Sequence, residues 1–415
     1  MQLEKYSFGV GDRFGRQGRA QLQALITAKA EGVNIAAVWN KSWREHSIIG
    51  SSPIDTYKAA ALAVKAMKWQ DSFYVDADHI QLSNVDLFLD SSNFFTIDVA
   101  ASIGQSANEE IINAFVSKYR KYAGRLEIAG IDEVLNIDEN QIEAIARKYL
   151  KAIDEAAFIY LHIESVKGKG NFITEISMDE TDAPQKPVEL YFILAAAAQR
   201  GIPVQTIAPK FSGVFLKGVD YIGDVAIFTK EFEQDLAIVA YAVKKFGLPE
   251  NLKISIHSGS DKFSLYKPIG RSIKKFDAGL HIKTAGTTWL EELTALAEAD
   301  KTGLSIAKRI YADAFERLDE LCEPYQKVVE IDKDKLPAPA VVKKWSSGDF
   351  VQTVRHDLTC SQYNKNVRQL LHIAYKIAAE MGSEFTDCLE HHQEFIGPKV
   401  TDNLYNRHIR PIFIE

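Results

Sequence analysis

Short apolar runs rich in β-branched and aromatic residues alternate along the chain with longer stretches in which apolar residues recur at helical spacing. Clear examples of the helical stretches are Pro187–Gln199 and Asp224–Lys245. Eight runs have the length and composition of buried strands, namely Tyr6–Gly11, Asn34–Trp39, Phe73–Asp78, Phe94–Val99, Phe172–Asp179, Val204–Ala208, Lys253–Ser258 and Gly279–Thr284. Strands that alternate with helices are parallel, because a parallel connection needs a crossover. Eight such units predict an α/β fold, a (β/α)8 barrel of the TIM type.

Two regions interrupt this rhythm. The connection after the fourth strand runs from Ala100 to Gln141 and carries a helix of its own, so we expect a lid-like insertion at about 101–136. The last quarter has few strand signals and contains a proline-bearing link, Asp334–Ala340, between helix-forming stretches. We therefore expect a catalytic barrel over residues 1–305 and a helical C-terminal extension over 306–415 that packs on the barrel.

Composition limits the location and the partners. The 415-residue chain has a formal net charge of −7, which argues against a nucleic-acid partner. Its three cysteines, Cys322, Cys360 and Cys388, have no CxxC spacing, which is typical of reduced cytoplasmic thiols. No apolar run approaches the roughly 20 residues that cross a bilayer, and the amino-terminal segment has no signal-peptide core. We expect a cytoplasmic protein without a membrane partner, while the pattern specifies no oligomeric state.

Polar residues gather where the predicted strands end. In a barrel of this type the catalytic residues lie at the carboxyl ends of the strands. Because a buried unpaired charge costs several kcal/mol, a purely structural barrel would not concentrate charges there. The pattern therefore predicts an active site. The polar residues concerned are Asp12, Arg13, Asn40, Lys41, Asp76, Asp78, His79, Asp98, Asp179, Glu180, Lys210, His257, Ser258, Ser260, His281 and Lys283.

Three of these residues are histidines from different strands. His79, His257 and His281 come from the third, seventh and eighth predicted strands. Imidazole is the commonest ligand for first-row metals, and three ligands leave positions open for a substrate. The alternative is that each histidine is a hydrogen-bonded core or loop residue. Their convergence at one barrel end favours a divalent metal site, for which Zn, Mn, Ni and Fe are all suitable ions.

Two carboxylates are candidates for proton transfer. Asp76 and Asp78 are two residues apart and share a face of the strand, so His79 points the other way while strand geometry persists. His79 can join them only if the chain leaves that geometry near Asp78. Glu180 opens the turn after the fifth strand, where a helix-capping role is the alternative. Carboxylates from opposite sides of a barrel mouth could act as base and acid on two faces of one carbon.

Two glycine-containing segments bear on cofactors and anions. Gly9, Gly11 and Gly15 follow the first strand, but their spacing is not GxGxxG, and the second strand ends in Asn40-Lys41 instead of an acidic residue. These features argue against a nicotinamide cofactor. The loop 284–288 precedes a helix and offers backbone N–H groups to an anion such as a phosphate or a carboxylate.

Segments spread over most of the chain resemble the tagaturonate epimerase family of hexuronate catabolism. They are FGVGDRFG, VDADHI, FFTID, SMDETDAP, ISIHSGSDKFSLY, HIKTAGTTWLEEL and, more loosely, VRQLLHIAY. The resemblance implies a metal-dependent barrel that interconverts tagaturonate and fructuronate.

The resemblance also implies roles for individual residues. It suggests Asp78 as the proton acceptor, Glu180 as the proton donor, and His79, His257 and His281 as ligands of a divalent metal. We expect contacts with a small sugar acid from the polar residues that surround them, Asp12, Arg13, Lys210, Ser258, Ser260 and Lys283.

The chemistry of this sugar pair favours carbon–carbon cleavage. Tagaturonate and fructuronate differ at a hydroxyl-bearing carbon two bonds from the ketone carbon, so removing the hydrogen on that carbon gains no enolate stabilisation. Transient oxidation would need a nicotinamide, and the sequence has no dinucleotide-binding motif. We therefore expect retro-aldol cleavage and re-addition, with a metal acting as Lewis acid. The alternatives are a metal-dependent aldolase, a ketose isomerase or epimerase acting on a related keto-sugar, and a non-catalytic sugar-acid-binding barrel.

Overall fold

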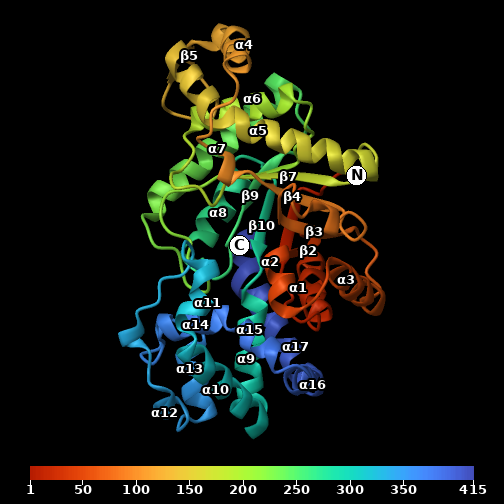
Figure 1. The fold of residues 1–415 in the computed structure, drawn as a ribbon, viewed down its shortest axis with the longest axis vertical. Helices are drawn as coiled ribbons and strands as arrows, with labels where there is room; N and C mark the ends of the chain where they lie inside the picture. Colours follow the sequence, from red (N-terminus) through yellow and green to blue (C-terminus); the bar gives the residue numbers. More distant parts are fainter.

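Eight parallel strands close into a barrel in the computed structural model, which describes residues 1–415 (Figure 1). Around the barrel the strand order is β1-β10-β9-β8-β7-β4-β3-β2, so each strand pairs with its neighbours in the chain and β1 pairs with β10. The barrel strands are β1 (Tyr6–Val10), β2 (Ala36–Ser42), β3 (Phe73–Ile80), β4 (Phe94–Asp98), β7 (Ile173–Ser177), β8 (Thr206–Ala208), β9 (Lys253–Ile256) and β10 (Leu280–Thr284). The predicted (β/α)8 fold is confirmed.

Helices connect the strands and continue beyond the barrel. The helices up to the last strand are α1 (Gly18–Ala30), α2 (Trp43–Ile49), α3 (Pro53–Met67), α4 (Glu109–Tyr119), α5 (Glu139–Lys167), α6 (Pro187–Gln199), α7 (Val225–Phe246) and α8 (Phe263–Lys275). After it follow α9 (Thr287–Ala299), α10 (Lys301–Glu316), α11 (Leu318–Cys322), α12 (Pro339–Val342), α13 (Ser347–Val354), α14 (Lys365–Ile373), α15 (Tyr375–Glu380), α16 (Ser383–His391), α17 (Gln393–Asp402) and a π-helical segment, Asn403–Ile414. None of these helices is both long and apolar enough to cross a membrane.

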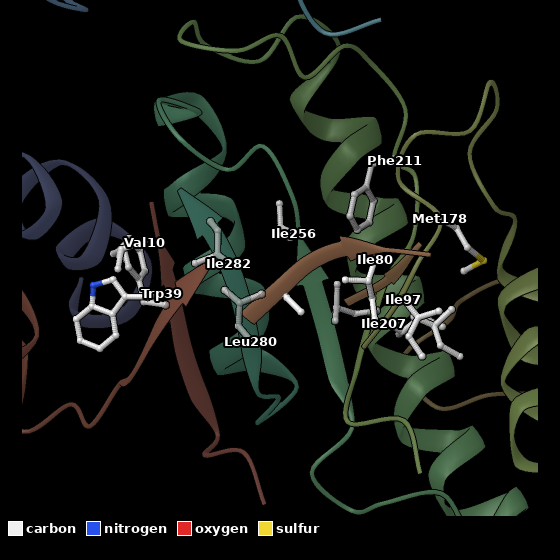
Figure 2. Close-up of a cluster of buried hydrophobic side chains, with 14 of the residues drawn as sticks. Val10, Trp39, Ile80, Ile97, Met178, Ile207, Phe211, Ile256, Leu280 and Ile282 are labelled. Carbon is white, nitrogen blue, oxygen red and sulfur yellow. The ribbon is translucent and has the colours of Figure 1, made fainter. Parts of the chain in front are cut away.

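Side chains alternate along each strand between the layer under the outer helices and the inside of the barrel. Most outward-facing strand residues are apolar and pack under the helices, and Figure 2 labels several of them, among them Ile97, Ile207 and Ile282. Inside the barrel, the amino ends of the strands are closed by apolar side chains: Leu3, Ala36, Val38, Tyr74, Phe94 and Ile173. Further along the same inward faces the buried residues become polar: Ser7, Asn40, Asp76, Thr96, Glu175, Ser255, His281 and Lys283. The barrel is therefore sealed at one end and polar toward the other.

The insertion after β4 contains α4 and a two-stranded antiparallel sheet, β5 (Gly124–Leu126) and β6 (Leu135–Ile137). Its aromatic residues pack on the outer helices: the Tyr119 hydroxyl donates to the carbonyl of Ala195 at 3.0 Å, and the Tyr119 ring lies 6.1 Å from that of Phe192. Figure 1 shows α4 and β5 at the top of the molecule, beside α5 and α6. The structure places the segment expected as a lid, 101–136, on the outer helices, where its aromatic residues pack against α6 and α7.

The C-terminal extension returns to the barrel. Helix α9 runs away from the barrel and packs against α10, α13 and α17 (Figure 1). The π-helical segment 403–414 packs against α8 and α1, and the rings of Phe413 and Tyr6 on β1 lie 5.2 Å apart. The last residues of the chain therefore fill the place in the outer layer between α8 and α1. The boundary expected at residue 305 therefore does not show that residues 403–414 complete the helical layer of the barrel. Helical periodicity in a sequence does not indicate which helices pack together.

The close approach of the π-helical segment to α8 predicts a steric limit at Gly270. A Cβ atom at this position would lie 2.5 Å from the carbonyl oxygen of Ile412. We expect Gly270→Ala to lower the free energy of unfolding by about 1–3 kcal/mol, measured by urea denaturation, because the overlap forces the segment away from α8.

The matched control is Gly348→Ala in α13, where the nearest neighbour of a Cβ atom would be the Ser346 hydroxyl at 3.6 Å. This change should be neutral or stabilise the protein by up to about 1 kcal/mol, because alanine is the better helix former. Equal effects of the two substitutions would contradict the packing described for residues 403–414.

Candidate functional site

The carboxyl ends of the barrel strands surround two adjoining hollows that share Asp179, Glu180, His257 and Ser258. The inner hollow is lined by strand and loop residues that include Asn40, Ser42, Asp78, His79, Ser260 and Lys283. The outer hollow is lined by the loop after β8 and its surroundings, including Pro209, Lys210, Phe211, Val214 and Phe215. The predicted position of the site at this end of the barrel therefore coincides with a cavity.

Three potential metal ligands meet at this cavity. Ligand atoms of His79, Asp179 and His257 all lie within 4.8 Å of one another. One Asp179 carboxylate oxygen, Oδ1, lies 3.4 Å from His79 Nε2 and 3.2 Å from His257 Nδ1. The two imidazole rings are 5.0 Å apart between centroids. The structure thus brings two of the three predicted histidine ligands together and adds the carboxylate of Asp179.

An irregularity in β3 explains how His79 reaches the inner side of the barrel. The pairing of β3 with β4 shifts register between Ala77 and Ile80, and His79 has a φ of 54°, in the left-handed region that a residue with a Cβ rarely adopts. Its Nδ1 atom consequently lies 3.0 Å from Oδ1 of Asp78. The chain therefore leaves regular strand geometry next to Asp78, as it must if His79 is to lie on the same side as Asp78.

His281 lies inside the barrel, apart from this group. It pairs in register with Ser7 of β1, and its Nδ1 atom is 2.9 Å from the Ser7 hydroxyl. Its ring lies 5.2 Å from that of Phe94, a residue of the apolar seal, and its Nε2 atom has no hydrogen-bond partner. Burial lowers the pKa of His281 to about 3, so the imidazole is neutral. The structure does not bring His281 into the cluster that contains His79 and His257.

A single lysine connects the carboxylates inside the barrel. The Lys283 ammonium group lies 2.7 Å from Asp76, 2.8 Å from Asp78 and 3.0 Å from Glu175, and it is also 2.6 Å from the Thr96 hydroxyl. The exposed fraction of Lys283 is 3%. Glu175 in turn accepts a hydrogen bond from His257 Nε2 at 2.7 Å. One buried cation therefore links strands β3, β7 and β10 and is connected through His257 to the group formed by His79, Asp179 and His257.

These contacts shift the pKa values of the groups involved. Burial opposes the ionisation of Asp78 and Glu175, but Lys283 and the neighbouring histidines outweigh burial and hold both pKa values well below their usual range. For Asp76 burial dominates and raises the pKa to about 7. Burial would lower the pKa of His257, yet Asp179 and Glu175 raise it to about 9. The carboxylates of the cluster therefore attract positive charge onto the imidazoles.

The two predicted proton-transfer residues both face the inner hollow. Asp78 is fixed by Lys283 and His79 at 2.8 and 3.0 Å. Glu180 lines both hollows, and its carboxylate has no hydrogen bond or ion pair with the protein. One carboxylate is therefore held in place while the other is available to a ligand.

The predicted substrate contacts divide into two groups. Ser258 and Ser260 line the inner hollow, and Lys210 lines the outer one. Asp12 lies at the loop before α1, where its carboxylate accepts hydrogen bonds from the backbone N–H groups of residues 15, 16 and 17 at 2.7–3.1 Å. Arg13 is buried in an ion pair with Glu45 and over the ring of Tyr375. Asp12 and Arg13 therefore support the wall of the site and do not line either hollow.

The glycine pattern after β1 has a packing explanation. A Cβ atom at Gly11 would lie 2.3 Å from the carbonyl oxygen of Ala285, in the loop between β10 and α9. The glycine lets these two loops meet at the barrel mouth.

Sequence reasoning missed several residues of the cavity. Glu175 precedes Ser177 and Asp179 at two-residue spacing, so the alternation along the fifth strand was a signal for it. Lys217, Arg44 and His372 also line the inner hollow, but they come from a loop and two helices, where no strand periodicity marks them.

The sequence and the fold are both similar to those of known tagaturonate/fructuronate epimerases. A sequence model of the tagaturonate epimerase family matches residues 1–409. The tagaturonate/fructuronate epimerase of Thermotoga maritima is 28% identical over 97% of this chain and 80% of its own length. Crystal structures of the fructuronate-tagaturonate epimerase from Cohnella laeviribosi, one native and one with glycerol bound, are each 24% identical. The native structure has a TM-score of 0.81 and the glycerol complex 0.82, over 99% of this chain and 82% of theirs, which shows that the fold is shared.

The contacts of Lys283 with three carboxylates predict that replacing this lysine lowers the free energy of unfolding by an amount that depends on pH. Lys283→Met would leave three carboxylates buried without the ammonium group, so we expect the free energy of unfolding to fall by about 3–5 kcal/mol near pH 8. The folded variant then binds protons more tightly than its unfolded chain. Because this linkage favours the folded state at low pH, the cost relative to the wild type should shrink as pH falls from 8 to 5.

Urea unfolding at several pH values measures this cost. Lys65→Met, which removes an exposed lysine of α3, is the control and should show no such trend. A cost for Lys283→Met that does not change with pH would show that the ammonium group does not neutralise these carboxylates.

Proposed function

The chain belongs to the tagaturonate epimerase family, and we propose that it interconverts tagaturonate and fructuronate. Membership makes it an isomerase-class enzyme, an epimerase. The observation that carries the assignment is the placement of Asp78 and Glu180 in one hollow with the His79–Asp179–His257 cluster. We further propose that it acts in the cytoplasm, in hexuronate catabolism, because all three cysteines are free.

We propose that His79, Asp179 and His257 hold a divalent cation. Their nitrogen and oxygen donors suit first-row ions such as Zn, Mn, Ni or Fe. The electrostatics also fit, because Asp78, Asp179 and Glu175 now raise the pKa values of the two histidines, and a cation would take the place of those protons. When bound, the cation would polarise the ketone and stabilise the negative charge that develops on its oxygen.

The residues of the hollow suit an inversion by carbon–carbon cleavage. Asp78, kept ionised by Lys283, would take the proton from the hydroxyl group on the inverted carbon. As that carbon becomes an aldehyde, the bond to its neighbour breaks, and the electron pair passes to the ketone fragment as an enediolate. Re-addition to the other face of the aldehyde forms the bond again, and Glu180 would protonate the new hydroxyl oxygen.

Product analysis tests the proposed reaction. The purified, metal-loaded protein is incubated with tagaturonate, and the sugars are separated by anion-exchange chromatography. We expect fructuronate, and the same final ratio when the reaction starts from fructuronate. Accumulating three-carbon fragments would instead identify an aldolase, a moved carbonyl group would identify a ketose isomerase, and binding without turnover would identify a sugar-acid-binding protein.

Substitutions should separate the metal ligands from the proton-transfer residues. His257→Ala and Asp179→Ala remove proposed ligands, so metal content and turnover should fall together. Asp78→Asn and Glu180→Gln keep the shape but not the proton exchange, so turnover should fall roughly 10²–10⁴-fold with the metal retained. His281→Ala should retain the metal. Elemental analysis and initial rates measure both properties.

The outcomes distinguish two ligand sets. If His281→Ala loses the metal and Asp179→Ala retains it, the three-histidine set implied by the family resemblance is right and the assignment of Asp179 is wrong. If Asp78→Asn or Glu180→Gln loses the metal, the division between ligands and proton-transfer residues is wrong.

A further inference from the structure

Part of the wall of the inner hollow is basic. Lys217 comes from the loop between β8 and α7, Arg44 from α2 and His372 from α14. The acid beside Arg44 in this wall, Glu45, is already paired with Arg13. A ligand in this hollow would therefore contact both the proton-transfer carboxylates and a separate group of basic side chains.

Lys217 has no anionic partner in the protein. No carboxylate lies within 4.0 Å of its ammonium group, and that group donates no hydrogen bond; its position is fixed instead by the backbone, where its N–H donates to the carbonyl of Val328 at 2.8 Å. The ammonium group lies 5.9 Å from the centre of the Tyr325 ring, which also carries the Arg44 guanidinium at 4.7 Å. Two cations therefore share one aromatic ring without an acid between them.

The electrostatics of Lys217 reflect this arrangement. Burial, together with Arg44 and Arg13, lowers the pKa of Lys217 to about 8, and the more distant Glu180 and Asp78 offset only part of the effect. Arg13 is already paired with Glu45. An anion bound at Lys217 would supply the charge that the protein does not.

His372 adds an unpartnered polar group to the same wall. Its exposed fraction is 3%, it lines the inner hollow, and its Nδ1 atom has no hydrogen-bond partner. Two glycines make room for the ring: a Cβ atom at Gly286 would lie 1.8 Å from His372 Nε2, and one at Gly218 would lie 3.1 Å from Cδ2. Burial holds the pKa of His372 well below its usual range, so the neutral ring keeps one N–H to donate.

We propose that Lys217 and His372 bind the carboxylate group of the sugar acid and so select ketouronates over neutral ketoses. The proposal rests on the function given above, because it assigns the one charged group that distinguishes tagaturonate from tagatose. In the cleavage proposed above, the aldehyde fragment is the part that bears this carboxylate. A carboxylate held at Lys217 would keep that fragment in the hollow while its aldehyde group turns the other face toward the enediolate.

The test compares tagaturonate with tagatose, which has a hydroxymethyl group in place of the carboxylate. Lys217→Met should raise KM for tagaturonate roughly 10- to 100-fold, the usual effect of losing a charge-assisted hydrogen bond, with a smaller change in kcat. Calorimetric dissociation constants should show the same loss for tagaturonate and no change for tagatose. Lys217→Arg keeps the charge and should recover much of the affinity.

Lys186→Met is the matched control. This lysine is exposed, directly precedes α6 and lines neither hollow. Its removal takes the same charge from the protein outside the site, so it separates a specific contact from a general change in net charge. We expect the affinities for both sugars to stay within about twofold of the wild type.

Each outcome bears on one of the two proposals. If the wild type converts tagaturonate but Lys217→Met leaves its KM and dissociation constant unchanged, the carboxylate site is wrong and the epimerase function stands. If kcat collapses equally for both sugars, Lys217 acts on the reacting carbons and is not a carboxylate anchor. If the wild type has no epimerase activity, the affinities for tagaturonate and tagatose still decide the carboxylate site, because binding needs no turnover.

Discussion

The site depends on the burial of one ammonium group inside the barrel. Lys283 contacts Asp76 and Glu175 in the closed interior of the barrel and Asp78 at the wall of the inner hollow. Without a cation these carboxylates would be protonated or would destabilise the fold, since a buried charge is tolerated only when it is paired. The lysine therefore permits a barrel that is apolar at its amino end and ionised at its carboxyl end.

Two further devices complete the cavity above this cluster. The register shift in β3 turns His79 toward Asp179 and His257, at the cost of a left-handed backbone conformation. The C-terminal extension contributes His372, and the chain then returns to fill the outer layer of the barrel with residues 403–414. The extension is thus part of both the barrel and the site.

The barrel could be predicted from the sequence. Strands that are buried on both faces stand out as short apolar runs, and the helices between them have apolar residues at helical spacing. The same periodicity placed Asp78, His257 and Lys283 at one end of the barrel. It could not show which inward residues share a layer, so His281 was grouped with His79 and His257 although it lies near the apolar seal. Asp12 and Arg13 end a strand like the others, but their partners come from local turns and distant helices that no pattern records.

We propose that the configuration changes because a carbon–carbon bond breaks, while the hydrogen on the inverted carbon stays in place. Asp78 then handles only a hydroxyl proton, and Lys283 keeps its carboxylate ionised so that it can accept one. Proton NMR of the conversion of tagaturonate in deuterated water tests this claim most directly. We expect fructuronate that retains hydrogen at the inverted carbon, and deuterium at that carbon would contradict cleavage of the carbon–carbon bond.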